Sequence, residues 1–260
     1  MYQGCRASSV HAHGASKNLR GTDAGYSEFN RRAPSILPTS TICNVLVFRP
    51  WRRWLALLFA FPLLAAAAYD AARVLEVAAG RGPRVHEQAQ ALVQLIERSS
   101  TQEELTRLRD INDFFNRRLA FKDDSVVWGV PDYWATPLES LEKRAGDCED
   151  YAIAKYFSLA ASGVPTAKLR MVYVRARLQG QSLAHMVLAY YAQPGAEPLI
   201  LDNLRPEVLP ASQRPDLTPV FSFNTEGLWQ GVGQVTAGDP LARLSLWREL
   251  VAKVRAEGFL

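Results

Sequence analysis

Apolar residues recur at helical spacing along the part of the chain that follows residue 68. Residues 71–100 place apolar side chains every three or four positions, and a Gly-Arg-Gly-Pro stretch at 80–83 interrupts this pattern. A second apolar stripe runs along 101–119, where Thr101 followed by Glu104 is typical of a helix N-terminal cap. The spacing therefore predicts two long helical segments, the first of them broken once.

Three further helices are expected around and after a polar stretch in the middle of the chain. Residues 121–133 scatter Asp, Gly and Pro among aromatic residues and are typical of a loop. The Thr-Pro-Leu-Glu sequence at 136–139 then predicts the start of a short helix. Residues 148–162 predict a helix of about four turns that ends at Gly163, and the amphipathic stretch 241–257 predicts a C-terminal helix.

The apolar period changes from helical to alternating after residue 168. Apolar and polar residues alternate along 169–178, which predicts a strand, and residues 184–192 and 198–204 predict two more. A further strand is expected at 220–223. Helices followed by strands indicate an α+β domain with an antiparallel sheet, which we place at residues 69–260 as a single unit.

The residues before this domain differ in composition. Residues 49–68 place three arginines before an apolar run and four alanines, which is the order of a secretory signal peptide cleaved near Ala67 or Ala68. The alternative is an uncleaved membrane anchor, but the apolar run from Trp54 is 15 residues long, and a spanning helix needs about 20. Residues 1–48 have no apolar periodicity, and we expect them to be disordered or to precede the true start of translation.

Charge is distributed unevenly along the chain. The whole sequence has a formal net charge of +4 and a pI near 9.0. Residues 1–68 hold 8 basic and 2 acidic residues, which leaves 22 basic and 24 acidic residues for 69–260. The basic pI therefore belongs to the leader, and we exclude nucleic acid as a partner on that ground. Three cysteines in 260 residues also exclude a disulfide-dense domain and a four-cysteine zinc site.

A cysteine stands at the expected start of one helix. Cys148 directly follows Gly146-Asp147, where backbone N–H groups and the positive end of the helix dipole favour a thiolate. The same N–H groups can hold the oxyanion that forms when a thiolate attacks a carbonyl. The alternative is a buried structural thiol, but a polar Asp-Cys-Glu-Asp run is not typical of an apolar core. We therefore interpret Cys148 as a nucleophile.

A cysteine nucleophile needs a base, and His185 is the best placed histidine after residue 68. His185 lies in a predicted strand, where an apolar residue is the default, whereas His86 lies in a polar helical stretch. Pairing the two strands across the predicted turn at 193–197 brings His185 within reach of Asp202. Together with Cys148, these residues would supply the nucleophile, the base and the orienting acid of an acyl-transfer triad.

Several short motifs resemble one bacterial family. They are Asp132–Glu139 (DYWATPLE), Gly146–Phe157 (GDCEDYAIAKYF), Ala184–Leu188 (AHMVL) and Leu201–Asn203 (LDN). Across residues 84–255 the chain resembles the bacterial transglutaminase-like cysteine proteinases. The resemblance implies a papain-like or transglutaminase-like fold with Cys148, His185 and Asp202 as the catalytic triad. It also implies a periplasmic endopeptidase that cuts in the N-terminal region of a large surface adhesin, which releases the adhesin and promotes biofilm dispersal.

The resemblance further implies a dependence on calcium, with Asp147 and Glu149 as ligands. Closely spaced carboxylates are hard oxygen donors that suit Ca²⁺. On the residues alone, Asp147 could instead be the N-cap of the helix, and Glu149 could complement the helix dipole. Two carboxylates are too few for the roughly six to eight oxygen ligands of Ca²⁺, so backbone carbonyls and Asp132 or Asp150 would have to contribute.

Two other functions are alternatives to proteolysis. A transglutaminase transfers an acyl group to an amine with the same triad, and the fold does not separate that reaction from proteolysis. The third function is a non-catalytic module that docks on a membrane receptor, and the resemblance implies an inner-membrane receptor for cyclic di-GMP as a sequestering partner. A complete set of Cys148, His185 and Asp202 argues against a module without catalysis.

Overall fold

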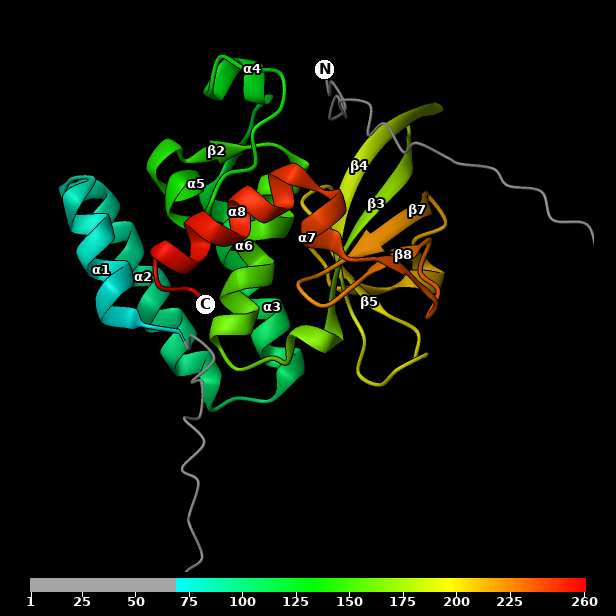
Figure 1. Ribbon diagram of the computed structural model, residues 1–260, viewed down its shortest axis with the longest axis horizontal. Coiled ribbons are helices and arrows are strands. Elements are labelled where there is room, and N and C mark those ends of the chain that lie inside the picture. Colours follow the sequence, from blue (N-terminus) through cyan, green and yellow to red (C-terminus); the bar gives the residue numbers. More distant parts are fainter. Residues whose placement is uncertain (1–68) are drawn as a thin grey trace, which may run out of the picture. The chain divides into compact units, whose positions relative to one another are not determined.

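The computed structural model describes residues 69–260 (Figure 1). The predicted leader (1–48) and signal peptide (49–68) lie outside the described residues. Within the described part, no helix is both long enough and apolar enough to cross a membrane.

The broken helical pattern of residues 71–100 forms two helices. Helix α1 (Ala71–Gly80) ends just before Gly82, whose φ of 115° is a backbone conformation that favours glycine. Helix α2 (Pro83–Ser100) begins with proline at its first position, where the missing N–H has no partner to lose. The two helices bury the apolar positions that the spacing predicts, which confirms this part of the sequence analysis.

The start of α3 (Glu104–Arg118) differs from the prediction. The residue before the helix is Glu103, and its side chain makes no capping hydrogen bond. Thr101 instead ends α2, where its hydroxyl donates to the carbonyl oxygen of Arg98 at 3.1 Å. The predicted cap at Thr101 is therefore wrong, because the Thr101 hydroxyl is already engaged by the preceding helix.

The short helix α5 (Pro137–Lys143) begins as its sequence predicts. The Thr136 hydroxyl accepts from the backbone N–H of Glu139 at 3.1 Å, and the Glu139 carboxylate accepts from the backbone N–H of Thr136 at 2.8 Å. This reciprocal capping box fixes the direction in which the chain enters the helix.

A small parallel pair of strands connects the start of the polar loop to the segment just before the next long helix. Strands β1 (Ala120–Phe121) and β2 (Ala145–Gly146) flank the loop and α5, and β2 ends two residues before Cys148. The loop contains one turn of helix, α4 (Asp124–Val127). Because β1 and β2 are paired, this loop lies beside the start of the next helix.

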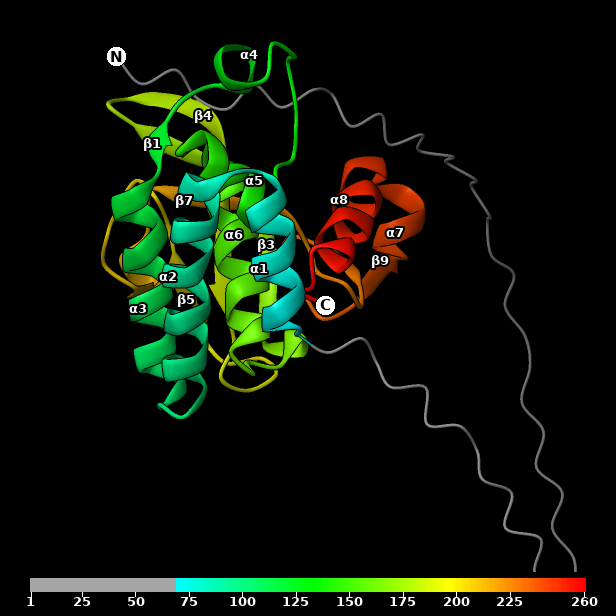
Figure 2. The same cartoon turned by 90° about the vertical axis from the view of Figure 1, so that its left-hand side faces the viewer.

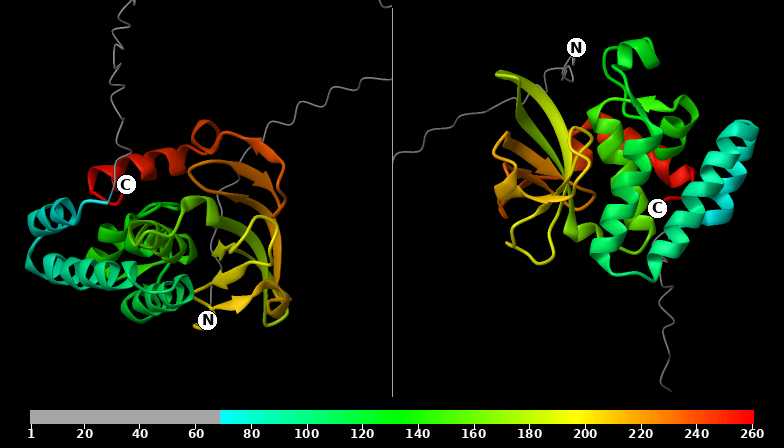
Figure 3. Two further views of the ribbon diagram at one scale, coloured as in Figure 1. Left: turned by 90° about the horizontal axis from the view of Figure 1, so that it is seen from below. Right: turned by 180° about the vertical axis from the view of Figure 1, so that it is seen from behind.

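Helix α6 (Cys148–Ala161) lies at the centre of the fold (Figures 1 and 2). Every residue from Cys148 to Leu159 is buried, including the charged ones. The helix packs between the other helices on one side and the sheet on the other (Figure 3). A side chain in the first turn of α6 therefore lies at the boundary between the helices and the sheet.

The sheet is antiparallel and has seven strands in the described residues, in the order β6-β5-β4-β3-β7-β8-β9. A 3₁₀ turn, η1 (Thr166–Lys168), leads into β3, and a second, η2 (Ala211–Gln213), precedes β7. The predicted α+β class, with helices first and an antiparallel sheet afterwards, is confirmed. The strands are β3 (Leu169–Leu178), β4 (Gln181–Tyr190), β5 (Leu199–Leu201), β6 (Leu209–Pro210), β7 (Leu217–Phe223), β8 (Leu228–Gln230) and β9 (Thr236–Gly238).

The C-terminal segment closes the helical side of the molecule. Its predicted helix forms two pieces, α7 (Pro240–Arg243) and α8 (Ser245–Ala256). Trp247 of α8 is fully buried; it stacks on Phe157 of α6 and meets the edge of Phe223 of β7. The C-terminal helix thereby joins the central helix to the sheet.

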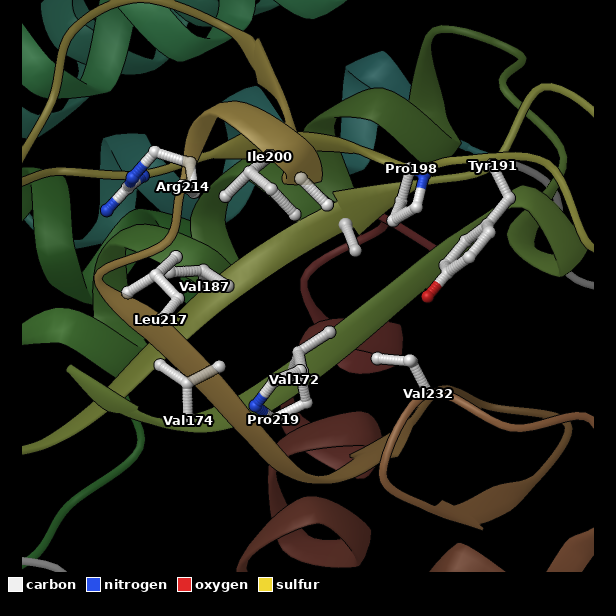
Figure 4. Close-up of a pocket in the computed structure, with 12 residues that line it drawn as sticks. Val172, Val174, Val187, Tyr191, Pro198, Ile200, Arg214, Leu217, Pro219 and Val232 are labelled. Atoms are coloured by element: carbon white, nitrogen blue, oxygen red, sulfur yellow. The ribbon is translucent and has the colours of Figure 1, made fainter.

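The outer face of the sheet, away from α6, carries a second and smaller apolar cluster (Figure 4). It surrounds a pocket of about 210 Å³ whose lining comes from β3, β4, β5 and β7 and the loops beside them. Arg214 lies at one end of this pocket, and its guanidinium points away from the apolar side chains.

Candidate active site

Cys148 is the first residue of α6 and lies in a polar, buried environment. Only 1% of its surface is exposed. Its Sγ lies 3.1 Å from Oε2 of Glu149 and accepts from the backbone N–H of Met186 at 3.3 Å. The sulfur therefore lies against the backbone of β4 at the residue next to His185.

His185 and Asp202 lie together, as the strand register predicts. In the β4–β5 pair, Leu188 lies opposite Leu201 and Tyr190 opposite Leu199, which is the register expected from the turn at 193–197. Continued by one residue, this register places Asp202 opposite Val187, on the same face of the sheet as His185 and diagonal to it. The His185 Nε2 and Asp202 Oδ1 atoms are 2.8 Å apart.

The surroundings of Asp202 keep its carboxylate ionised. Oδ1 also accepts from the backbone N–H of Leu204 at 3.0 Å, and Oδ2 accepts from Nη2 of Arg214 at 2.6 Å. Burial alone would raise the pKa of Asp202, but its hydrogen bond with His185, the His185 charge and the Arg214 guanidinium hold it well below the ordinary range. With Nε2 of His185 held by Asp202, Nδ1 is the ring nitrogen available for proton exchange.

Five carboxylates gather between the loop at 121–133 and the first turn of α6. Single oxygens of Asp124, Asp132 and Glu149 lie within 4.8 Å of one another, and so do oxygens of Asp124, Asp147 and Asp150. Asp124 belongs to both groups, so the five side chains form one continuous cluster. We call these five residues the acidic cluster.

The acidic cluster fits a divalent cation, because several of its buried oxygen atoms have no hydrogen-bond donor in the described residues. Four buried oxygens have no hydrogen-bond partner among residues 69–260, namely Oδ1 of Asp124, Asp132 and Asp147 and Oδ2 of Asp150. Burial, as the largest cause, raises the pKa of all five carboxyls, that of Asp124 to about 6. A hard cation would satisfy these oxygens and offset the repulsion between the carboxylates.

The N-cap alternative for Asp147 is not supported by the geometry. Asp147 does occupy the N-cap position of α6, but its side chain makes no capping hydrogen bond. Glu149 and Asp150 lie in the first turn of the helix, where carboxylates also complement the dipole. The two sequence candidates for a metal ligand, Asp147 and Glu149, are both members of the acidic cluster, and Asp132 and Asp150 lie there with them.

Asp124 and Arg214 are the residues that sequence reasoning missed. Asp124 lies in a stretch that reads as an ordinary loop, and it reaches the acidic cluster only because β1 and β2 pair. A pair of consecutive aspartates, Asp123-Asp124, was the one signal available. Arg214 contacts Asp202 from a proline-rich loop whose path the pattern of apolar residues does not define.

Comparison with known proteins identifies relatives of this arrangement. The sequence profile of the family described as bacterial transglutaminase-like cysteine proteinase (BTLCP) matches residues 84–222. Legionella pneumophila LapG in its EGTA-treated form is 37% identical with a TM-score of 0.65, covering 73% of this chain and 100% of that chain. The calcium-bound form of the same protein is 36% identical with a TM-score of 0.63, covering 71% and 98%. No curated protein matches the sequence.

The matched family segment contains Cys148, His185, Asp202 and the whole acidic cluster. The similarity to LapG extends over nearly the full length of the solved chains, and one of those structures holds calcium. The chain belongs to the bacterial transglutaminase-like cysteine proteinases.

Proposed function

We propose that this protein is a periplasmic, calcium-dependent cysteine endopeptidase with Cys148 as nucleophile, His185 as general base and Asp202 as orienting acid. Its substrate is the N-terminal region of a large surface adhesin, whose release promotes biofilm dispersal. The observation that carries the proposal is the buried His185–Asp202 pair beside a helix-start cysteine, in a chain of this proteinase family.

In the reduced protein, His185 takes the proton of the Cys148 thiol, and Sγ forms a bond to the carbonyl carbon of the peptide. The backbone N–H groups at the start of α6 favour the oxyanion that results. The carbon–nitrogen bond then breaks as His185 returns the proton to the leaving amine. Water activated by the same imidazole hydrolyses the thioester, which regenerates the thiol.

The acidic cluster would hold the calcium ion. When bound, Ca²⁺ supplies a fixed positive charge and oxygen coordination. Asp124 and Asp132 come from the loop, whereas Asp147, Glu149 and Asp150 come from α6 or the residue before it. A cation bound to the cluster would therefore connect the loop to the segment that carries Cys148.

The substrate, compartment and partner follow from the family resemblance. A signal peptide at 49–68 would deliver the protein to the periplasm. There, an inner-membrane receptor that senses cyclic di-GMP would sequester the protease and so control adhesin release. Calcium from the surrounding medium reaches that compartment, which agrees with a requirement for calcium in activity.

A cleavage assay tests the proposal. The purified full chain is mixed with the N-terminal region of a large adhesin from the same genome, under reducing conditions, with Ca²⁺ or with EGTA. We expect one cut that EGTA abolishes and that Cys148→Ala cannot make. A cut by the Cys148→Ala variant would contradict the proposal. Ammonia release from a glutamine peptide, without peptide cleavage, would favour acyl transfer to an amine instead.

A further inference from the structure

Behind Asp202 lies a buried arginine that contacts two carboxylates at once. Nη2 of Arg214 donates to Oδ2 of Asp202 at 2.6 Å and to Oδ2 of Asp216 at 2.8 Å. Nε of Arg214 donates to Oδ1 of Asp216 at 3.1 Å. The Arg214 side chain is 1% exposed and that of Asp202 is 0% exposed, whereas that of Asp216 reaches the surface at 24%.

The backbone around Arg214 holds its side chain in this place. Arg214 follows η2, and its N–H donates to the carbonyl oxygen of Ala211 at 2.9 Å. Its own carbonyl oxygen accepts from Leu217, the first residue of β7, at 3.1 Å. The stem of the side chain lines the outer pocket, and the guanidinium points away from it (Figure 4). The arginine is thus fixed at both its backbone and its head group.

These contacts leave Asp202 with one orientation. Its Oδ1 is used by His185 and by the N–H of Leu204, so Oδ2 needs a separate donor. A buried carboxylate oxygen without a donor is unfavourable, because it has lost its hydrogen bonds to water and gained none in the protein. Arg214 is the donor that the described residues provide.

The charges around Asp202 balance when Arg214 is present. Asp202, Arg214 and Asp216 together carry one net negative charge, the same as an isolated aspartate. A positively charged imidazolium at His185 on β4 would then face one net negative charge from these three residues. The charges of Asp202 and of Asp113 on α3 both act on the buried Lys155 of α6. Loss of Arg214 would leave the carboxylates of Asp202 and Asp216 facing each other without the cation that both now contact.

We propose that Arg214 is a positioning residue of the cysteine proteinase, which fixes the Asp202 carboxylate so that Oδ1 faces Nε2 of His185. The proposal rests on the proposed function, since it assigns Asp202 the orienting role. Arg214 does not touch the substrate, and it acts only through Asp202. Asp216 accepts from Nε and Nη2 of the same guanidinium and so helps to hold Arg214 against Asp202.

The test compares Arg214→Gln and Arg214→Lys with Arg107→Gln in the full chain. Arg107 is a matched structural control, because it donates three hydrogen bonds to backbone carbonyls of Ser100, Gln102 and Ser162, away from Asp202. For adhesin cleavage we expect Arg214→Gln to lower kcat about tenfold to a hundredfold, the range for loss of a hydrogen bond to a charged group, with KM nearly unchanged. Arg214→Lys should recover part of this loss, and Arg107→Gln should leave kcat unchanged.

The pH profile separates positioning from mere structural support. Without Arg214, Asp202 takes up a proton at higher pH, so the acid limb of kcat/KM should move to higher pH in Arg214→Gln and less so in Arg214→Lys. An unchanged limb and an unchanged kcat in both variants would overturn the proposal. If Arg214→Gln does not fold, Arg214→Lys alone provides the test, because that variant has lost the guanidinium geometry that contacts both carboxylates. An unchanged pH profile of kcat/KM in Arg214→Lys would then contradict the proposal.

A second readout does not depend on cleavage. The proton that His185 Nε2 donates to Asp202 should give a downfield NMR signal, assigned by its absence in His185→Ala. We expect Arg214→Gln to shift or lose this signal while Arg107→Gln keeps it; an unchanged signal in Arg214→Gln would overturn the proposal. If the wild-type chain shows this signal but cuts no adhesin, the proposed function fails and the NMR comparison still decides the role of Arg214.

Discussion

At the residue scale, the least expected side chain is Lys155. It lies about two turns along α6 from Cys148, is fully buried, and its Nζ has no hydrogen-bond partner in the described part of the chain. Burial, the largest cause, lowers the pKa of Lys155 to about 7, although the charges of Asp202 and Asp113 act in the opposite direction. Burial in the folded protein therefore destabilises the charged form of Lys155 relative to the unfolded chain.

This burial predicts a specific pH dependence of stability. The folded pKa of about 7 lies below the unfolded lysine value of about 10.4, so the unfolded chain binds more protons between these values, and the free energy of unfolding rises with pH there. Lys155→Met should flatten the rise and raise the free energy of unfolding near pH 7 by about 1–3 kcal/mol. Urea unfolding at several pH values measures both effects. The exposed Lys122→Met is the control, and an equal slope in both variants would refute the account.

At the scale of elements, the acidic cluster connects a loop to a helix. The loop after β1 contributes Asp124 and Asp132, and the start of α6 contributes the other carboxylates. Without a cation these closely spaced carboxylates repel one another, and four of their buried oxygens have no donor in residues 69–260. A bound cation would therefore stabilise the folded protein through the contact between these two elements.

Calcium should raise the Tm by about 5–10 °C at a concentration one hundred times its Kd, since such binding adds about 2.7 kcal/mol. Asp124→Asn should reduce that rise to less than half. In EGTA the same variant should melt at a higher temperature than the wild type, because a buried and uncompensated charge is removed. Asp123→Asn, the adjacent aspartate outside the cluster, should behave like the wild type. Calorimetry in Ca²⁺ and in EGTA distinguishes these outcomes.

At the scale of the whole molecule, one aromatic cluster joins the C-terminal helix to both layers. Trp247 contacts the rings of Tyr156, Phe157 and Phe223, and its indole N–H donates to the carbonyl oxygen of Asn224 at 3.2 Å. The contacts connect α8 with α6 and with β7. Removing this side chain would therefore weaken the packing of the helices against the sheet.

We expect Trp247→Ala to lower the free energy of unfolding by about 3–5 kcal/mol, the usual cost of truncating a large buried aromatic side chain. Val235→Ala, at a position that is 86% exposed, should change it by less than about 0.5 kcal/mol. Guanidinium unfolding of the two variants gives the comparison. A loss below about 1 kcal/mol for Trp247→Ala would show that α8 is not needed to hold the layers together.

Local features explain which parts of this molecule could be predicted from the sequence. The turn between β4 and β5 fixes the strand register, so the nearness of His185 and Asp202 could be derived from a short stretch. The capping box at Thr136 is likewise local. Asp124 and Arg214 reach the site through long connections and through strand pairs far apart in the chain, which no local pattern encodes.

The most direct test of the central claim is to trap the covalent intermediate. The reduced full chain with Ca²⁺ is mixed with the adhesin fragment, quenched in acid within the first turnover, and measured by intact mass and peptide mapping. The account predicts a mass increase equal to that of the N-terminal cleavage product less one water, located as a thioester on Cys148, and no such increase in EGTA. Cleavage that proceeds with no adduct, or with an adduct on another residue, would contradict it.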